Sequence, residues 1–118
     1  MHVPASHLQI KRAYAPPEPG DGTRVLVDRL WPRGVRKEAA RIDWWAKDLA
    51  PSDELRRWFG HDPERFEAFR ARYAAEIEGS PALARLRSLV RGETVTLVYA
   101  AKDERHNNAV VLAELLGR

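Results

Sequence analysis

The sequence predicts a single-domain, layered α/β fold with a small, mostly parallel sheet flanked by about four helices. Short apolar runs have the pattern of buried strands, and capped segments with helical apolar spacing have the pattern of helices. The two kinds of segment alternate, which is typical of a parallel sheet covered by helices. The chain has 118 residues, 44% of them hydrophobic, which suits one domain over residues 1–118. We expect residues 1–7 to form a loosely ordered extension.

Three segments are predicted to be strands. Residues 8–14 alternate loosely between apolar and polar side chains, and residues 24–28 form a short apolar run that ends at turn-forming residues. Residues 94–100 (TVTLVYA) are rich in β-branched and aromatic side chains, the composition of a buried strand. The run APPEPGDG (15–22) predicts a turn between the first two strands. Residues 42–48 fit either a short strand or an irregular segment.

Three helices in the middle of the chain have clear start and end signals. Each follows a serine or aspartate that can cap a helix N-terminus, and each is closed by a glycine. The signals are Ser52 and Gly60 for the first helix, Asp62-Pro63 and Gly79 for the second, and Ser80-Pro81 and Gly92 for the third. Residues 107–116 repeat apolar side chains at helical spacing and predict a fourth helix.

Two of the predicted strands run directly into clusters of polar side chains. The second strand leads into VDRLWPRG (27–34), and the last strand leads into KDERHNN (102–108), which opens the final helix. Ligands of open α/β sheets bind outside the carboxyl ends of the strands. If these strands are parallel neighbours, both clusters lie on that edge, where amide groups of the last helix also favour anions. We therefore expect a pocket for a small anionic ligand of phosphate or nucleotide type.

The residue types in these clusters suggest roles in such a pocket. Arginine and lysine hold anions, whereas aspartate and histidine transfer protons. The predicted ligand-binding residues are Arg29, Trp31, Arg33, Lys102 and Asn107, and the predicted catalytic residues are Asp28, Asp103 and His106. The pattern leaves open whether the protein is an enzyme. If it is one, hydrolysis or group transfer at a phosphate or glycosidic bond is the expected chemistry.

These residues also have structural interpretations. The alternatives are an ion pair for Asp28 with Arg29, core packing for Trp31, a position over Trp31 or at a helix C-terminus for Arg33, a plain N-cap for Asn107 and a surface position for His106. In the extreme case, Asp28, Arg29 and Lys102 form a buried ion-pair network that locks the sheet edge and leaves no cavity.

A second function class is a nucleic-acid or protein binding module without catalysis. The chain has 20 basic and 17 acidic residues and a net charge of +3, a mild preference for anionic partners. Trp44, Trp45 and Trp58 could stack on bases, although they suit a core or a lid better. Dedicated DNA-binding proteins cluster their basic residues on one face, so nucleic acid is the less favoured partner.

Several kinds of site are not expected. The chain has no cysteine, which excludes disulfides and thiolate chemistry and suits a cytoplasmic protein. No paired histidines or carboxylate run indicate a metal site, and no Walker or GxGxxG motif indicates a cofactor. No stretch approaches the ~20 apolar residues of a membrane helix, and the first residues lack the apolar region of a signal peptide. We expect a monomer or a homodimer.

Long ordered strings of the sequence resemble the YeaO-like branch of the domain-of-unknown-function 488 family. They are GTRVLVDRLWPRG (22–34), WAKDLAPSDELRRWFGHDPERFEAFRARY (45–73) and TLVYAAKDERHNNAVVLAELL (96–116). The resemblance covers residues 10–116 and implies a compact bacterial α/β protein without an established activity.

The residues that match the family signature coincide with the two polar clusters. They are Asp28, Arg29, Trp31, Pro32, Arg33, Gly34, Lys102, Asp103, His106 and Asn107. The resemblance implies a shared pocket rather than a particular reaction. Other branches of the family place cysteines in the segment that corresponds to residues 99–103, which reads YAAKD here. A thiol mechanism therefore does not transfer to this chain.

Overall fold

A four-stranded sheet with the strand order β1-β4-β2-β3 lies at the centre of the fold, and all of its strand pairs are parallel. The strands of this computed structural model, which describes residues 7–117, are β1 (Leu8–Arg12), β2 (Thr23–Leu26), β3 (Trp44–Trp45) and β4 (Val95–Tyr99). The predicted α/β class is confirmed. The expectation of a loosely ordered extension concerns mainly residues 1–6, which lie outside the described residues.

The ambiguous segment 42–48 contains the short edge strand β3. Its two tryptophans pair with β2, and hydrogen bonds from Asp43 N and Ala46 N to β2 carbonyls extend the pairing at both ends. The chain then enters a 3-10 helix at Lys47–Leu49. Both interpretations of the segment therefore hold in part. β2 itself ends at Leu26, two residues before the predicted end.

Five α-helices lie within residues 7–117, namely α1 (Lys37–Ala40), α2 (Asp53–Phe59), α3 (Phe66–Ile77), α4 (Pro81–Gly92) and α5 (Asn108–Leu115). The last four are those that the sequence predicts. The side chains of Ser52, Asp62, Ser80 and Asn107 each accept a backbone hydrogen bond as N-caps. Asp62 caps the 3-10 turn Pro63–Arg65, which leads into α3, rather than α3 itself.

The sequence does not predict helix α1. This helix has one turn, lacks a side-chain cap and ends at Arg41 in the left-handed region (φ 50°). One turn is too short to display an apolar repeat, and isolated helices of this length are unstable in water. Arg24 of β2 holds it in place, because its Nε–H donates to Ala40 O at 2.9 Å. A tertiary contact rather than local sequence therefore stabilises α1.

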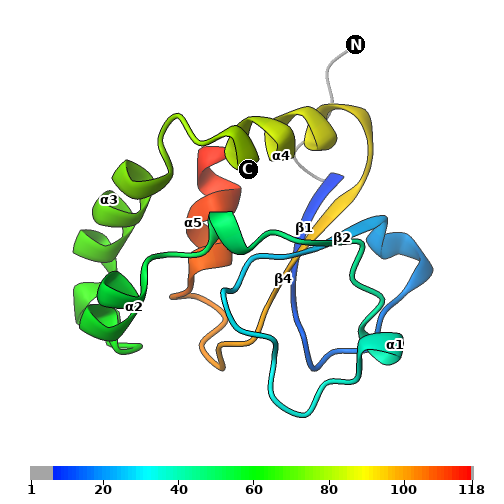
Figure 1. Ribbon diagram of the computed structural model, residues 1–118, viewed down its shortest axis with the longest axis horizontal. Coiled ribbons are helices and arrows are strands. Elements are labelled where there is room, and N and C mark those ends of the chain that lie inside the picture. The colour runs from blue at the N-terminus through cyan, green and yellow to red at the C-terminus, as the bar shows by residue number, and fades with distance from the viewer. Residues whose placement is uncertain (1–6, 118) are drawn as a thin grey trace.

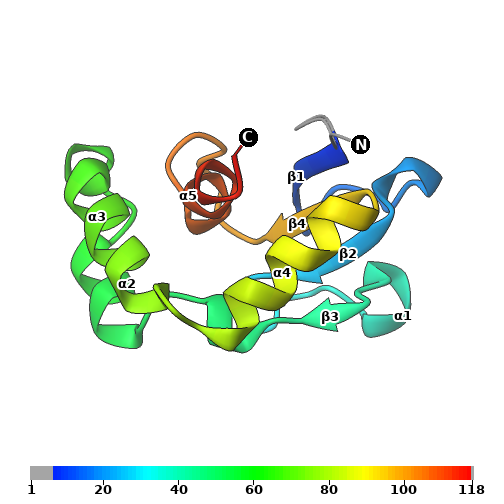
Figure 2. The ribbon, with the colours of Figure 1, turned by 90° about the horizontal axis from the view of Figure 1, so that it is seen from above.

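The sheet separates two hydrophobic clusters of unequal size. Side chains alternate between the two faces of a strand, so Val25 and Leu97 belong to the larger cluster, whereas Leu26 and Val98 belong to the smaller. The larger cluster includes side chains from α2, α3, α4 and α5. Figures 1 and 2 show α2, α3 and α5 on one side of the sheet and α1 on the other. The helices therefore cover one face, and loops with α1 cover the second.

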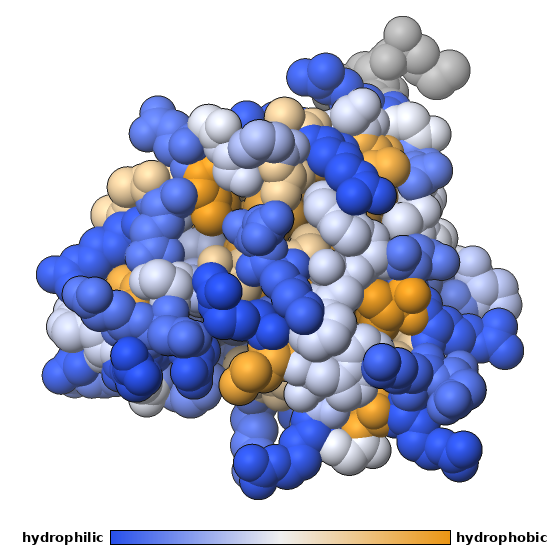
Figure 3. Space-filling model, viewed as in Figure 1, coloured by the Kyte–Doolittle hydropathy of each residue, from blue (hydrophilic) through white to orange (hydrophobic). Residues whose placement is uncertain are grey.

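The surface seen in Figure 3 is mainly hydrophilic, and its apolar side chains form separate patches. Among residues 7–117, two large hydrophobic side chains are exposed, Tyr14 at 48% and Leu30 at 65%. In this part of the chain, no helix has the length and apolar character that a membrane crossing requires.

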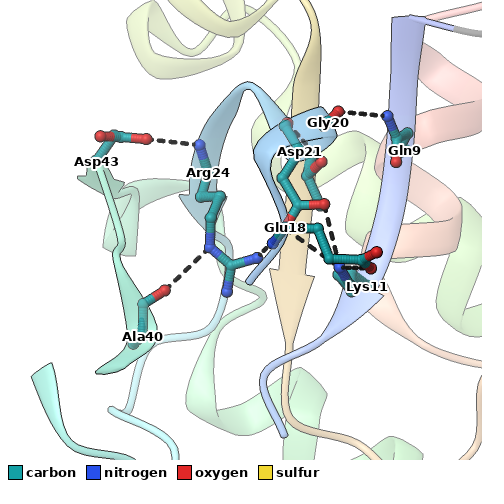
Figure 4. Close-up of polar contacts among 9 residues, drawn as sticks. Gln9, Lys11, Glu18, Gly20, Asp21, Arg24, Ala40 and Asp43 are labelled. Carbon is teal, nitrogen blue, oxygen red and sulfur yellow. Dashed lines mark hydrogen bonds and ion pairs between the residues drawn. The ribbon is translucent and has the colours of Figure 1, made fainter. Parts of the chain in front are cut away.

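A buried ion pair lies near the start of β2 (Figure 4). Asp21 Oδ2 is 2.6 Å from Arg24 Nη1, and both side chains are only 4% exposed. Lys11 Nζ lies 3.1 Å from Asp21 Oδ1, and the Glu18 N–H donates to Asp21 Oδ2 at 3.0 Å. Burial alone raises the pKa of Asp21, but the hydrogen bonds and the two cations outweigh burial and lower the pKa. The predicted turn 15–22 is therefore held by a charged network.

Candidate functional site

A cleft of about 680 Å³ lies at the carboxyl ends of β1, β4 and β2. β2 and β4 are parallel neighbours, so the segments that follow them meet at one edge of the sheet. In Figure 1 these loops form the lower edge of the molecule, beside the start of α5. The cleft is lined by Tyr14, residues 28–33, Ala50, Pro51, Arg56, Phe59, His61, Phe69, residues 100–103, Asn107 and Asn108.

Seven of the eight predicted site residues line this cleft. They are Asp28, Arg29, Trp31, Arg33, Lys102, Asp103 and Asn107. His106 is the exception, because it is not part of the lining. Its ring packs edge-on against Phe66, with the ring centroids 5.1 Å apart. The structure therefore brings the two polar clusters together but places the predicted catalytic histidine outside the cleft.

Asp103 organises the loop between β4 and α5. Its Oδ1 accepts hydrogen bonds from Arg105 N at 2.9 Å and His106 N at 3.1 Å, and its Oδ2 lies 2.8 Å from His106 Nδ1. These contacts, led by the Arg105 N–H and the His106 side chain, lower the pKa of Asp103. The ionised form of Asp103 is therefore favoured, and this carboxylate joins the His106 ring to a residue that lines the cleft.

Asp28 is a partly buried carboxyl group in the lining of the cleft. Its Oδ2 accepts a hydrogen bond from the Ala100 N–H at 2.9 Å, and its Oδ1 accepts one from Asn108 Nδ2 at 3.2 Å. Burial raises the pKa of Asp28, although both hydrogen bonds and the nearby His61 act in the opposite direction. A carboxyl group that is costly to ionise and lies in a cleft is a candidate proton acceptor.

Replacing Asp28 with asparagine is expected to remove the free-energy cost of ionising a partly buried carboxyl group, a cost that grows with pH. Because the folded-state pKa of Asp28 is raised, its contribution to stability is present below the unfolded-state pKa and is lost as pH rises through the folded-state pKa. Between about pH 3 and pH 7, the free energy of unfolding of Asp28→Asn should therefore rise relative to that of the wild type. The gain is about 1.4 kcal/mol for each unit of pKa difference between the two states.

Urea unfolding at a series of pH values measures this gain. Asp48→Asn is the matched control, because Asp48 is exposed and lies outside the cleft. A difference between Asp28→Asn and the wild type that does not change with pH would contradict the prediction.

Two asparagines at the start of α5 form hydrogen bonds with the segments that line the cleft. Asn107 Oδ1 accepts a hydrogen bond from the first turn of α5 at 3.0 Å, and its Nδ2 donates to Asp103 O at 2.9 Å. The plain N-cap interpretation therefore describes Asn107, whose amide is largely occupied. Asn108 is buried and donates to Val27 O at 2.8 Å as well as to Asp28. It ties the start of α5 to the segment after β2.

Four cationic side chains line the cleft, and all four are exposed. Arg29 Nε and Arg56 Nη2 lie 3.7 Å and 3.6 Å from Asp53 Oδ1, and exposed pairs of this kind are weak. Arg33 and Lys102 have no ion-pair partner among residues 7–117. The alternative of a closed ion-pair network without a cavity is therefore wrong. Within the same range, no three histidine or acidic side chains converge on a metal position.

Trp31 combines the two interpretations that the sequence leaves open. Its Nε1–H donates to Val35 O at 2.6 Å, and its ring packs edge-on against Trp45 with centroids 5.4 Å apart. It also lines the cleft. Trp31 therefore anchors the loop after β2 and is available to a ligand on its remaining surface.

The sequence does not predict that α2 and α3 supply part of the lining of the cleft. Arg56 and Phe59 come from α2, His61 follows it, and Phe69 comes from α3. Arg56 and Phe59 are three residues apart and therefore share a helix face. Which face turns toward the cleft depends on the packing of α2 against α3, and Phe59 stacks on Phe69 with centroids 4.3 Å apart. No local signal in the sequence specifies this contact.

Known proteins similar to this chain identify its family. The family described as the inactive DUF488-N3 subclade matches residues 7–118. The chain belongs to the DUF488 family. An uncharacterised protein of Mycobacterium tuberculosis is 47% identical over 114 residues, which are 97% of each chain. The uncharacterised Escherichia coli protein YeaO is 42% identical over 115 residues, 93% of this chain and 96% of YeaO.

The YeaO-like branch of DUF488 that the sequence predicts is thus confirmed. No solved structure matches the chain.

Proposed function

We propose that this DUF488 protein binds a small anionic ligand, such as a phosphate or a nucleotide, through Arg33 and Lys102. The observation that carries the proposal is that these two cations line a cleft and have no ion-pair partner among residues 7–117. Cations gathered at a concave surface raise the local concentration of anions. Arg29 and Arg56 add to this field, and so does the positive end of the α5 dipole.

We favour binding without turnover. The family that matches the chain is described as an inactive subclade, which supports this choice. The lining holds two carboxyl groups, of which Asp28 has a raised pKa and Asp103 a lowered one, together with His61, whereas His106 lies outside it. Hydrolysis or group transfer is the alternative, in which Asp28 takes up the proton; its raised pKa is the observation in favour.

A nucleic-acid binding module is the less favoured candidate. Stacking on bases needs open aromatic faces, and the three tryptophans of this region each have a cation over one face. Lys47 lies 3.9 Å from the Trp45 ring centroid, Arg85 4.0 Å from that of Trp44, and Arg72 4.2 Å from that of Trp58. Strongly salt-dependent binding of single-stranded DNA would support this candidate instead.

The place of action is also a proposal. A chain without cysteine gains nothing from an oxidising compartment. We therefore propose that the protein works in the cytoplasm, and a fluorescent fusion in a bacterial cell tests this location.

Binding of inorganic phosphate tests the proposed function. Calorimetric titration is expected to give one weak site, and Arg33→Ala and Lys102→Ala should each weaken it about two- to fivefold, the effect of losing an exposed charged contact. Arg87→Ala is the matched control, because Arg87 is exposed on α4 and lies outside the cleft. A panel of nucleotides extends the titration, and phosphate release from them reports turnover.

Two results would refute the proposal. One is the absence of any binding or thermal shift with phosphate and with the nucleotides. The other is an equal loss of affinity in Arg87→Ala, which would mean that phosphate binds through the general charge of the surface.

A further inference from the structure

The cleft divides into an exposed cationic part and a buried apolar part. Arg33, Lys102 and the two other cations are exposed, whereas Pro51, Phe59 and Phe69 in the same lining are buried. A ligand that fills the cleft therefore meets positive charge near the solvent and aromatic or aliphatic surface further in. An anion alone would leave the inner surface unused.

The exposed large hydrophobic side chains add apolar surface to the exposed part of the cleft. Tyr14 and Leu30 are the two such side chains among residues 7–117, and both line the cleft. Leu30 is 65% exposed and lies between Arg29 and Arg33 in the sequence. Exposed apolar groups gathered at one concave site are typical of ligand contact.

The polar groups of the inner part are already engaged. Asp28 accepts hydrogen bonds from Ala100 N and Asn108 Nδ2, and Asn108 also donates to Val27 O. Few hydrogen-bonding groups thus remain for the body of a ligand. A body rich in hydroxyl groups, such as a sugar, would lose its hydrogen bonds to water without replacing them, which is unfavourable.

We propose that the ligand is an amphipathic anion, with a compact aromatic body in the inner cleft and one phosphate or carboxylate group at Arg33 and Lys102. The inference rests on the proposed anion binding and adds the chemistry of the rest of the ligand. A volume of about 680 Å³ lies within the usual range for sites that hold small molecules. The apolar contacts come from Phe59 in the buried part and from Tyr14 and Leu30 in the exposed part, and they give affinity through burial of apolar surface.

Phenyl phosphate is the probe that tests this inference, with inorganic phosphate and ribose 5-phosphate as reference ligands. All three carry a phosphate group, but only phenyl phosphate carries an aromatic body. Calorimetric titration of the full chain is expected to give at least tenfold tighter binding for phenyl phosphate than for either reference. Phenol, which lacks the phosphate, should bind much more weakly than phenyl phosphate.

Two variants separate the two parts of the site. Leu30→Ser should weaken phenyl phosphate binding several-fold and leave inorganic phosphate binding unchanged, whereas Lys102→Ala should weaken both. Leu30 is exposed, so its replacement leaves the core intact. Circular dichroism and the melting temperature of each variant verify the fold.

The outcomes distinguish this inference from the proposed function. If inorganic phosphate binds and phenyl phosphate binds no tighter, the aromatic body is refuted while the proposed anion binding stands. Tighter binding of ribose 5-phosphate than of phenyl phosphate, or a Leu30→Ser variant with unchanged affinity for phenyl phosphate, also refutes it. If none of the phosphate compounds binds, both proposals fall.

Discussion

Replacement of Asp21 with asparagine is expected to lower the free energy of unfolding by about 3–5 kcal/mol, because it leaves the buried guanidinium of Arg24 without a counter-charge. Arg24 is buried with Asp21. Lys11 contacts the same carboxylate but keeps Glu18 as a second partner at 2.6 Å. The Nη2 of Arg24 is already a buried donor without a partner, and the one other acceptor of this guanidinium, Ala40 O, is uncharged. Urea unfolding at pH 7 measures the change.

The effect of Asp21→Asn should also depend on pH. The folded-state pKa of Asp21 is lowered, so its stabilising contribution is present above the unfolded-state pKa and is lost as pH falls through the folded-state pKa. The difference between the variant and the wild type should therefore shrink below about pH 4. The control is Glu67→Gln, which removes the exposed Glu67–Arg70 ion pair and should cost less than about 1 kcal/mol. A cost for Asp21→Asn as small as that of the control would contradict the prediction.

Replacement of Gly22 with alanine is expected to destabilise the fold by roughly 2–6 kcal/mol, the sum of backbone strain and steric overlap. Gly22 has φ 64° and ψ −137°, a backbone conformation that residues other than glycine rarely adopt. A Cβ atom there would lie 2.2 Å from Thr94 O. Since the overlap is with backbone atoms of the segment before β4, the contact cannot be relieved by a side-chain rotation.

Gly20→Ala is the matched control for Gly22→Ala. Gly20 lies in the same turn, and a Cβ atom at its position would meet nothing within 4 Å. Thermal and urea unfolding should show Gly20→Ala close to the wild type and Gly22→Ala far below it. Equal stability of the two variants would mean that the turn shifts to accommodate the methyl group.

The helix ends are the part of the fold that local chemistry makes predictable. The side chains of Ser52 and Asn107 accept hydrogen bonds from the N–H three residues further on, so cap and partner lie within one turn. Gly60 ends α2 in the left-handed region (φ 52°), which glycine adopts without strain. Such signals depend on neighbours in sequence, and packing elsewhere does not change them.

The position of the cleft could be inferred from the direction of the strands rather than from local hydrogen bonding. Parallel strands all end at the same edge, so Asp28 after β2 and Lys102 after β4 meet although they are more than seventy residues apart. The sequence therefore predicts the place and most of the lining. The lining does not include His106, whose ring packs against Phe66 and contacts Asp103.

The charged network at the other end of the sheet shows what could not be inferred. An aspartate in a proline- and glycine-rich turn commonly bonds its own backbone, and Asp21 has that appearance in the sequence. Its partners Lys11 and Arg24 come from β1 and β2, two strands that are separated by β4 in the sheet. Only the folded turn brings these three side chains together.

The sequence by itself thus determined the α/β class, the helix ends and the edge of the sheet at which the cleft lies, because these depend on local hydrogen bonding and on strand direction. The tertiary structure decided which cleft cations lack an ion-pair partner within residues 7–117, here Arg33 and Lys102, and which large apolar side chains of this range stay exposed, here Tyr14 and Leu30. The physical reason is that pairing and burial depend on distances between segments remote in sequence, which only the packed core sets.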